Sequence, residues 1–390
     1  MTTSPLFEPF KLKSLEIRNR VVMAPMTRSK SPDETPGDDV ALYYRRRAEG
    51  GVGLIITEGT TIDRAGSSND SNIPNLYSPQ SIDGWRKVVA AVHAAGAKIA
   101  PQIWHQGMVR RAGTGPRPGG KSDGPSGLSG SGKQIAEPMT DSDIADTIDA
   151  FARAALVAKK IGFDAVELHG AHGYLVDQFF WAQTNKRNDA YGGNLVQRTR
   201  FAAEIIKAIR MRVGPEFVII HRFSQWKQQD YGARLAHTPD ELAALLTPLV
   251  DAGVDIFHGS TRRFWEPEFS GSDLNLSGWS KKLTGKPSIT VGSVGLKGAD
   301  FIDSYKGKGA EVGELHDLEA RLGRGERSCR DRPGADRRSI LDIESSRPAI
   351  QRVVGIFSGI NGNALIPELF DRNQALATNP GQAYLEAVKY

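Results

Sequence analysis

Two histidines and a tyrosine lie close together in the segment HGAHGYLVDQF, residues 169–179. The apolar run DAVEL at residues 164–168 comes directly before them and is typical of a short, buried parallel strand. We therefore expect His169, His172 and Tyr174 to lie in a loop at the end of that strand and to converge on a pocket. Two neutral imidazoles can donate hydrogen bonds to one carbonyl or nitro oxygen, while a nearby phenol can protonate a carbon atom. The spacing predicts a site that reduces a polarised double bond.

Two other interpretations of these residues stay open. The histidines can be structural groups with satisfied hydrogen bonds, and Tyr174 can be a packing residue. The pair His169 and His172 can also bind a metal ion, as in a metal-dependent hydrolase. The segment does not share the helical spacing of the zinc motif, and no third ligand stands out, so we predict no metal site.

Strand and helix patterns alternate along the chain, which predicts parallel strands joined by helices. Each strand pattern is rich in β-forming residues and ends in Gly, Ser or polar residues. Seven such runs occur: RVVMAP (20–25), GVGLIITEG (51–59), KIAPQIWHQG (98–107), DAVELHG (164–170), FVIIHRFS (217–224), VDIFHGS (254–260) and PSITVGS (287–293).

The segments around these strands predict helices, a hairpin and a loop. A helix pattern begins with Asp141 or Ser142 as its N-cap, and another follows Thr238. The opening FEPFKLKSLEIRNR, residues 7–20, predicts a small hairpin that plugs the closed end of a barrel. Residues 110–133 are rich in Gly, Pro and Ser, which favours a flexible lid on the mouth side.

Length and composition favour one large barrel domain. The chain has 390 residues, 39% of them hydrophobic, with a net charge of +5 and dispersed Lys and Arg, so no basic stripe indicates nucleic acid. The single cysteine, Cys329, excludes an internal disulfide. The N-terminus lacks the pattern of a signal peptide, and no apolar run is long enough to span a membrane. We predict a cytoplasmic protein, monomer or homodimer, that acts on a small molecule.

Polar residues at the predicted strand ends suit a flat, electron-accepting cofactor. An amide such as Gln102 can pair with the edge of a heterocycle, and a hydroxyl such as Thr27 can bind a ring carbonyl. The guanidinium of Arg222 can stabilise an anionic ring. The candidates are Thr27, Gly59, Gln102, Trp104, His169, His172, Tyr174 and Arg222.

Several long motifs in this chain resemble the Old Yellow Enzyme family over about residues 5–325. They are RNRVVMAPMTR (18–28), PQIWHQG (101–107), HGAHGYLVDQF, TNKRNDAYGG (184–193) and FSQWKQQDYG (223–232). The resemblance implies a (β/α)8 TIM barrel that binds FMN, with NADPH or NADH as the reductant. It also implies hydride transfer from flavin N5 to the β-carbon of an α,β-unsaturated carbonyl or nitro compound.

The resemblance also implies roles for individual residues. Tyr174 corresponds to the proton donor, and His169 and His172 correspond to the pair that binds the substrate oxygen. The residues expected to bind FMN are Pro25, Met26, Thr27, Gly59, Gln102, Arg222, Gly292 and Ser293.

The chain departs from the family after Glu326. The family continues with an apolar eighth strand, a Gly-Arg pair that binds the FMN phosphate, and a helix, whereas residues 327–348 are dense in Arg and Asp. Read one nucleotide later with permitted codons, this stretch can encode DPVAIGRALIADRSW, which has the family's pattern. We therefore divide the chain into a flavin-binding barrel at residues 1–326 and an atypical segment at residues 327–390, frame-shifted and partly disordered. The alternative function is a non-catalytic barrel that binds small molecules and has lost firm FMN binding.

Overall fold

The computed structural model of this chain describes residues 4–297, 311–312, 318–319 and 321. Within these residues, seven strands form one parallel sheet in the order β3–β4–β5–β6–β7–β8–β9. The strands are β3 (Val22–Met23), β4 (Leu54–Thr61), β5 (Lys98–Trp104), β6 (Ala165–His172), β7 (Val218–Lys227), β8 (Ile256–Ser260) and β9 (Ser288–Val291).

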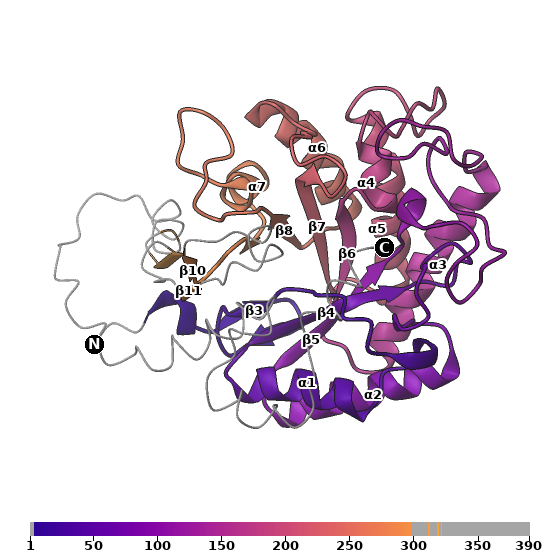
Figure 1. Ribbon diagram of the computed structural model, residues 1–390. Helices are drawn as coiled ribbons and strands as arrows, with labels where there is room; N and C mark the ends of the chain where they lie inside the picture. The colour runs from indigo at the N-terminus through magenta and orange to yellow at the C-terminus, as the bar shows by residue number, and fades with distance from the viewer. Residues whose placement is uncertain (1–3, 298–310, 313–317, 320, 322–390) are drawn as a thin grey trace.

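Each strand pairs with the next one along the chain, and helices lie outside the strands (Figure 1). This is the arrangement of a (β/α) barrel, and it confirms the seven strand predictions and their parallel order. The helices are α1 (Asp38–Glu49), α2 (Pro79–Ala94), α3 (Asp141–Lys160), α4 (Leu175–Phe180), α5 (Arg200–Val213), α6 (Pro239–Ala252) and α7 (Leu276–Thr284). Short 3-10 turns are η1 (Pro5–Phe7), η2 (Pro32–Glu34), η3 (Gly107–Val109) and η4 (Gln197–Thr199).

The two faces of the strands pack in separate apolar clusters. Side chains alternate across a strand, so residues of one parity face the helices and residues of the other face the barrel interior. On β7, for example, Ile219 packs with the helices, whereas Val218 and Ile220 belong to the interior cluster. Burial of both faces explains why the strands read as apolar runs in the sequence.

A hairpin closes the bottom of the barrel, as the sequence predicts. Strands β1 (Phe10–Leu12) and β2 (Leu15–Ile17) pair antiparallel. Leu15 and Ile17 are buried in the interior cluster with residues of β4 to β8, while Glu16 between them is exposed. The hairpin therefore fills the end of the barrel with the apolar face of β2.

The N-cap of α3 lies one or two residues before the predicted position. The Thr140 side chain accepts a hydrogen bond from the Asp143 N–H, and the Asp143 carboxylate accepts one from the Thr140 N–H. This reciprocal capping box favours Thr140 over Asp141 or Ser142 because it satisfies two N–H groups at once. Helix α6 begins directly after Thr238, as predicted, and Thr238 is its N-cap.

The part of the chain where the family has its eighth strand, and the whole segment 327–390, lie outside the described residues. In the part of the chain that the structure describes, β3 and β9 each pair with a single neighbour in the parallel sheet. A separate antiparallel pair joins β10 (Leu296–Lys297) to β11 (Glu311–Val312).

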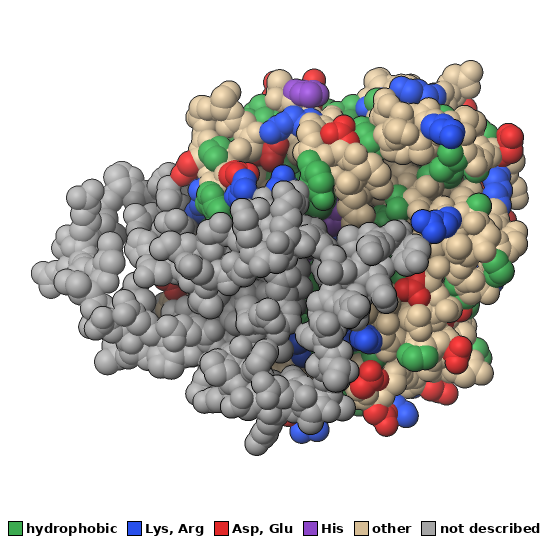
Figure 2. Space-filling view, viewed as in Figure 1, with side chains coloured by type: hydrophobic (Ala, Val, Ile, Leu, Met, Phe, Trp, Pro, Cys, Tyr) green, Lys and Arg blue, Asp and Glu red, His purple; other side chains and the backbone are tan. Residues whose placement is uncertain are grey.

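The described surface mixes charges of both signs. Figure 2 shows Lys and Arg side chains interspersed with Asp and Glu over the described part of the face turned to the viewer. Among the residues that the structure describes, no helix is both long and apolar enough to cross a bilayer.

Replacing Leu15 with Ala tests the hairpin as a structural plug. Leu15 has no exposed surface, so its truncation leaves a cavity at the end of the barrel. We expect the free energy of unfolding to fall by about 2 to 5 kcal/mol, measured by urea denaturation. The exposed neighbour Glu16 provides the control, because Glu16→Ala should change stability by less than about 0.5 kcal/mol. Equal effects of the two substitutions would show that the hairpin is not packed in the barrel.

Candidate functional site

Four polar side chains, from the neighbouring strands β5 to β8, meet in the barrel interior above the apolar cluster. Gln102 Nε2 donates to Glu167 Oε1 at 2.8 Å, and His258 Nδ1 lies 2.6 Å from Glu167 Oε2. Arg222 is close enough to Glu167 for its charge to affect the carboxylate. We call Gln102, Glu167, Arg222 and His258 the polar layer.

The charge of Glu167 is stabilised although the side chain has no exposed surface. Burial by itself would raise the pKa of the carboxyl. The interaction with His258, the charge of Arg222 and the hydrogen bond from Gln102 outweigh burial, so the pKa lies below its ordinary value. Glu167 is therefore ionised at neutral pH.

Two residues further along β5, β6 and β8 lie Trp104, His169 and Ser260, on the same interior face. All three are buried. Tyr174 joins them from the N-cap of α4, and its ring centroid lies 5.0 Å from that of Trp104 and 5.1 Å from that of His169. The His169 and His172 rings are 5.2 Å apart and nearly perpendicular. The structure thus brings the three predicted reactive side chains together at the carboxyl end of β6.

The two histidines lie in the strand itself, which corrects the prediction that they belong to a loop. β6 continues to His172, and its pairing with β7 becomes irregular between Gly170 and His172. His172 has a φ of 65°, and its N–H donates to Ser224 Oγ at 3.0 Å. This left-handed conformation is rare outside glycine. It turns the chain sharply, so Tyr174 comes back over the strand end.

Both imidazoles are neutral at physiological pH. Burial lowers the pKa of His169 and of His172 well below the ordinary value, and the positive charge of Arg222 lowers both further. The Ala171 N–H donates to His169 Nδ1 at 3.3 Å, so the neutral ring carries its proton on Nε2. His169 can thus donate a hydrogen bond to an acceptor without bringing a second positive charge beside Arg222.

A buried ion pair stabilises the turn that carries Tyr174. Lys227 Nζ lies 2.7 Å from Asp177 Oδ1, and neither side chain is exposed. The other Asp177 oxygen accepts the Gly173 N–H at 2.7 Å. Burial raises the pKa of Asp177 and lowers that of Lys227, in each case against the pull of the partner's charge. Asp177 therefore binds Lys227 of β7 through one carboxylate oxygen and the turn at Gly173 through the other.

The predicted cofactor-binding residues border this site from β4, β5 and β7. A Cβ atom on Gly59 would lie 2.8 Å from the Trp104 ring and 3.1 Å from Thr27 Oγ1, so only glycine allows this close approach. In the part of the chain that the structure describes, Trp104 Nε1, Arg222 Nε and His258 Nε2 are buried without a hydrogen-bond partner. Such atoms are suited to a polar ligand.

The remaining predicted residues follow the first and last strands of the sheet. Pro25 and Met26 are half-buried and lie two and three residues beyond the end of β3. Gly292 and Ser293 follow β9 with φ values of 136° and 49°. The Ser293 hydroxyl donates to the Arg262 carbonyl at 3.0 Å. These residues border the same end of the barrel as the carboxyl ends of the other strands.

Sequence reasoning missed several residues of the site. Glu167, His258 and Ser260 lie inside runs that we read only as apolar strands. Trp226 was also missed; its ring lies 4.5 Å from that of His172. Side chains alternate between the two faces of each strand, and this alternation puts Glu167 and His258 on the same interior face as Gln102 and Arg222. The pattern could therefore have identified both residues from the sequence.

The loop at residues 110–133 has more internal structure than a flexible lid. The buried Arg110 side chain donates to backbone carbonyls of Ser68, Thr114, Arg117 and Gly120. Asp123, further along, pairs with Arg64 at 3.0 Å and with His105 at 3.0 Å. The loop is therefore tied to the ends of β4 and β5.

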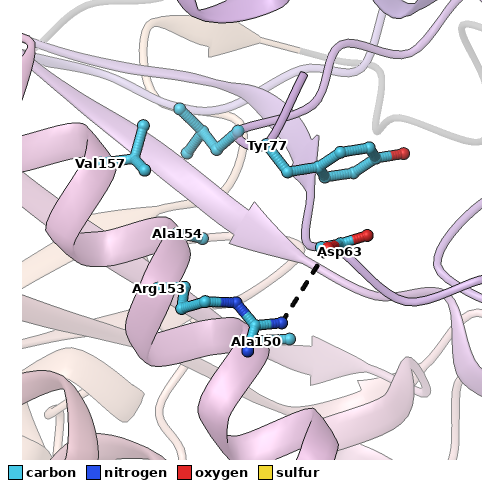
Figure 3. Close-up of a pocket in the computed structure, with 7 residues that line it drawn as sticks. Asp63, Tyr77, Ala150, Arg153, Ala154 and Val157 are labelled. Atoms are coloured by element: carbon cyan, nitrogen blue, oxygen red, sulfur yellow. Dashed lines mark ion pairs between the residues drawn. The ribbon is translucent and has the colours of Figure 1, made fainter. Parts of the chain in front are cut away.

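A cavity lies outside the barrel, away from the residues of the candidate site. It has a volume of about 250 Å³ and is lined by α3 and the segments after β4 (Figure 3). Its Asp63 carboxylate pairs with Arg117 at 3.1 Å and faces Arg153 at 4.0 Å. Because these charges already satisfy one another, we place the candidate site at the barrel mouth. Within the described residues, no three His, Cys, Asp or Glu side chains are arranged to bind a metal ion.

Comparisons with known proteins found a matching family and several relatives. Residues 5–308 match the model of the NADH:flavin oxidoreductase / NADH oxidase family. Putative 12-oxophytodienoate reductase 2 of Oryza sativa subsp. japonica is 41% identical over 215 residues, which cover 54% of this chain and 57% of the plant protein. The chain thus spans little more than half the length of that curated relative.

Solved structures share the fold. Morphinone reductase in complex with tetrahydroNAD is 29% identical and superposes with a TM-score of 0.67, covering 82% of this chain and 84% of that one. Old Yellow Enzyme from a Pichia species is 27% identical with a TM-score of 0.61, covering 75% and 83%.

His221 is a buried histidine that faces away from the site, and it allows a test of acid stability. Its ring packs near Phe180 and Phe257, and among the described residues neither ring nitrogen has a hydrogen-bond partner. Burial lowers its pKa from 6.5 to about 4. Between these values the unfolded chain binds a proton that the folded chain does not, so stability falls as the pH decreases.

The buried neutral His221 should lower the free energy of unfolding by about 3 kcal/mol between pH 6.5 and pH 4. We expect His221→Phe to remove this part of the pH dependence. Urea denaturation of wild type and variant at several pH values measures the difference. The control is His237→Gln, because His237 is exposed, and it should keep the wild-type pH dependence. Parallel curves for wild type and His221→Phe would contradict the expectation.

Proposed function

The chain belongs to the NADH:flavin oxidoreductase / NADH oxidase family, and on that premise we propose that it is an FMN-dependent ene-reductase. It reduces the activated C=C bond of α,β-unsaturated carbonyl or nitro compounds. The observation that carries the proposal is the convergence of His169, His172 and Tyr174 directly above the polar layer.

The residues at the barrel mouth fit FMN. The Trp104 ring and the Thr27 hydroxyl lie so close to Gly59 that a Cβ atom there would overlap them, so glycine sets the position of both groups beside the proposed flavin ring. The ring edge needs donors and acceptors, which are offered by Gln102 and by Arg222 Nε, an atom with no hydrogen-bond partner among the described residues. Pro25, Met26, Gly292 and Ser293 complete the proposed binding residues. When bound, FMN accepts hydride from a reduced nicotinamide and delivers it to the β-carbon of the alkene.

The histidines bind the oxygen of the substrate in this mechanism. His169 donates from Nε2, and His172 donates beside it, so that negative charge developing on the oxygen is stabilised in a buried site. The neutral state of both rings matters because a neutral imidazole donates one hydrogen bond without repelling Arg222. Trp104 and Trp226 form apolar walls that exclude water.

Tyr174 supplies the proton to the α-carbon. Its hydroxyl donates to Gln228 Oε1 at 3.4 Å, a long contact that a substrate can replace. Trp104 and His169 hold its ring from two sides with edge-to-face contacts. The phenol is therefore positioned beside both histidines.

The reductant, the cellular location and the oligomeric state are proposed from membership of the family. The reductant is NADPH or NADH, and the similarity to morphinone reductase in complex with tetrahydroNAD supports a nicotinamide as the reductant. We propose a cytoplasmic protein that works as a monomer or homodimer on a small-molecule substrate. Residues 1–326 form the flavin-binding unit.

Uptake of FMN tests the proposed function. Purified protein incubated with excess FMN and then desalted should retain one flavin per chain, measured by absorbance. We expect Gly59→Ala to weaken binding about tenfold, because the added methyl group overlaps the Trp104 ring. Gly119→Ala is the matched control, since a Cβ there meets nothing within 4 Å. A folded protein that takes up no FMN would support the non-catalytic barrel instead.

Replacing Tyr174 with Phe tests the proton donor. The rate of enone reduction should fall by about 10² to 10⁴, the usual loss of a general acid, while reduction of the flavin by NADPH is retained. Stopped-flow absorbance of the flavin separates the two half-reactions. Tyr191→Phe removes a hydroxyl that donates to Glu204 at 2.8 Å, outside the site, and should leave both rates unchanged. Wild-type rates in Tyr174→Phe would remove this assignment.

A further inference from the structure

Ser260 connects the polar layer to the substrate-binding histidines. It lies at the end of β8 and is buried. Arg222 Nη2 lies 3.3 Å from its hydroxyl oxygen, and His172 Nε2 lies 2.8 Å from the same oxygen. Nothing in the proposed mechanism uses this residue so far, although it touches one group on each side of the site.

The chemistry of the three groups fixes the direction of the hydrogen bonds. A guanidinium can only donate, so Arg222 occupies one lone pair of the Ser260 oxygen. The hydroxyl proton then needs an acceptor, and among the described residues His172 Nε2 is the one within reach. A buried hydroxyl without an acceptor is costly, which favours donation from Ser260 to His172. The positive charge of Arg222 also polarises the hydroxyl and strengthens this bond.

We propose that Ser260 is a positioning residue that fixes the tautomer of His172, with the ring proton on Nδ1. This inference rests on the proposed function. An imidazole whose Nε2 accepts a hydrogen bond must carry its proton on Nδ1 to remain a neutral donor. His169 has the opposite arrangement, because its Nδ1 accepts the Ala171 N–H. The pair thus offers one Nε2–H and one Nδ1–H. The tautomer of His169 is fixed by Ala171 in the same strand, and that of His172 is fixed by Ser260 on β8.

The surroundings of His172 keep the ring in this orientation. Trp226 lies against one face, with ring centroids 4.5 Å apart and planes 32° apart, and its Nε1–H donates to the Ser260 carbonyl at 3.1 Å. The His172 N–H is bound by Ser224 Oγ. Ser260 therefore contacts the imidazole through its hydroxyl and the adjacent indole through its backbone.

Nitrogen NMR of the ¹⁵N-histidine-labelled holoenzyme tests the proposal directly. The chain has 8 histidines, and the spectrum of His172→Gln identifies the resonances of His172. In wild type we expect an unprotonated Nε2 and a protonated Nδ1. In Ser260→Ala, the proton should move in part to Nε2. A wild-type ring protonated on Nε2, or an unchanged ring in Ser260→Ala, would overturn the proposal.

Kinetics supply the second readout. For cyclohex-2-enone, kcat/KM of Ser260→Ala should fall roughly fivefold to tenfold, as expected from one lost hydrogen bond, and Ser260→Thr should restore most of it. Ser280→Ala is the matched control, because it removes an equally buried hydroxyl that donates to the Ser277 carbonyl. A similar loss in Ser280→Ala would show a general effect of packing. Failure of the proposed function appears separately, as absent FMN uptake, whereas the tautomer can also be measured in protein without flavin.

Discussion

Glu167 carries a negative charge in the barrel interior without any exposed surface. The arrangement of the site depends on the hydrogen bonds and the opposite charge that stabilise this carboxylate. An isolated buried carboxylate is strongly unfavourable and would take up a proton. Gln102 and His258 each bind one of its oxygens, and Arg222 supplies the opposite charge. Each side chain that binds the Glu167 carboxylate has little freedom to rotate, so the polar layer is rigid before any ligand binds.

The rigid polar layer also fixes the residues above it, because they contact its side chains directly. Arg222 faces Glu167 on one side and Ser260 on the other, so the guanidinium links the polar layer to His172. The same positive charge lowers the pKa of His169 and His172 and keeps both neutral. One buried cation thus affects both the proposed cofactor site and the proposed substrate site. The Asp177–Lys227 pair holds the Tyr174 turn against this framework.

Much of this could be predicted from local patterns. The seven strand runs were found because burial on both faces makes parallel strands apolar, and His169, His172 and Tyr174 were found because polar residues directly follow such a run. The sequence alone predicts the α3 cap one or two residues too late, because Thr140, Asp141 and Ser142 are all good N-caps. Only the reciprocal hydrogen bonds with Asp143 select Thr140. The loop at 110–133 looked featureless because its organiser, Arg110, binds backbone carbonyls, which leave no trace in composition.

The sequence by itself determined which side chains reach the barrel mouth, because a strand has a fixed two-residue period and parallel strands end at one edge. Only the tertiary structure decided which of these side chains bind one another. Glu167 and His258 are 91 residues apart, and Ser260 and His172 are 88 apart, so their contacts depend on how neighbouring strands are staggered around the barrel. That stagger is set by packing of the whole sheet, and no local pattern of residues encodes it.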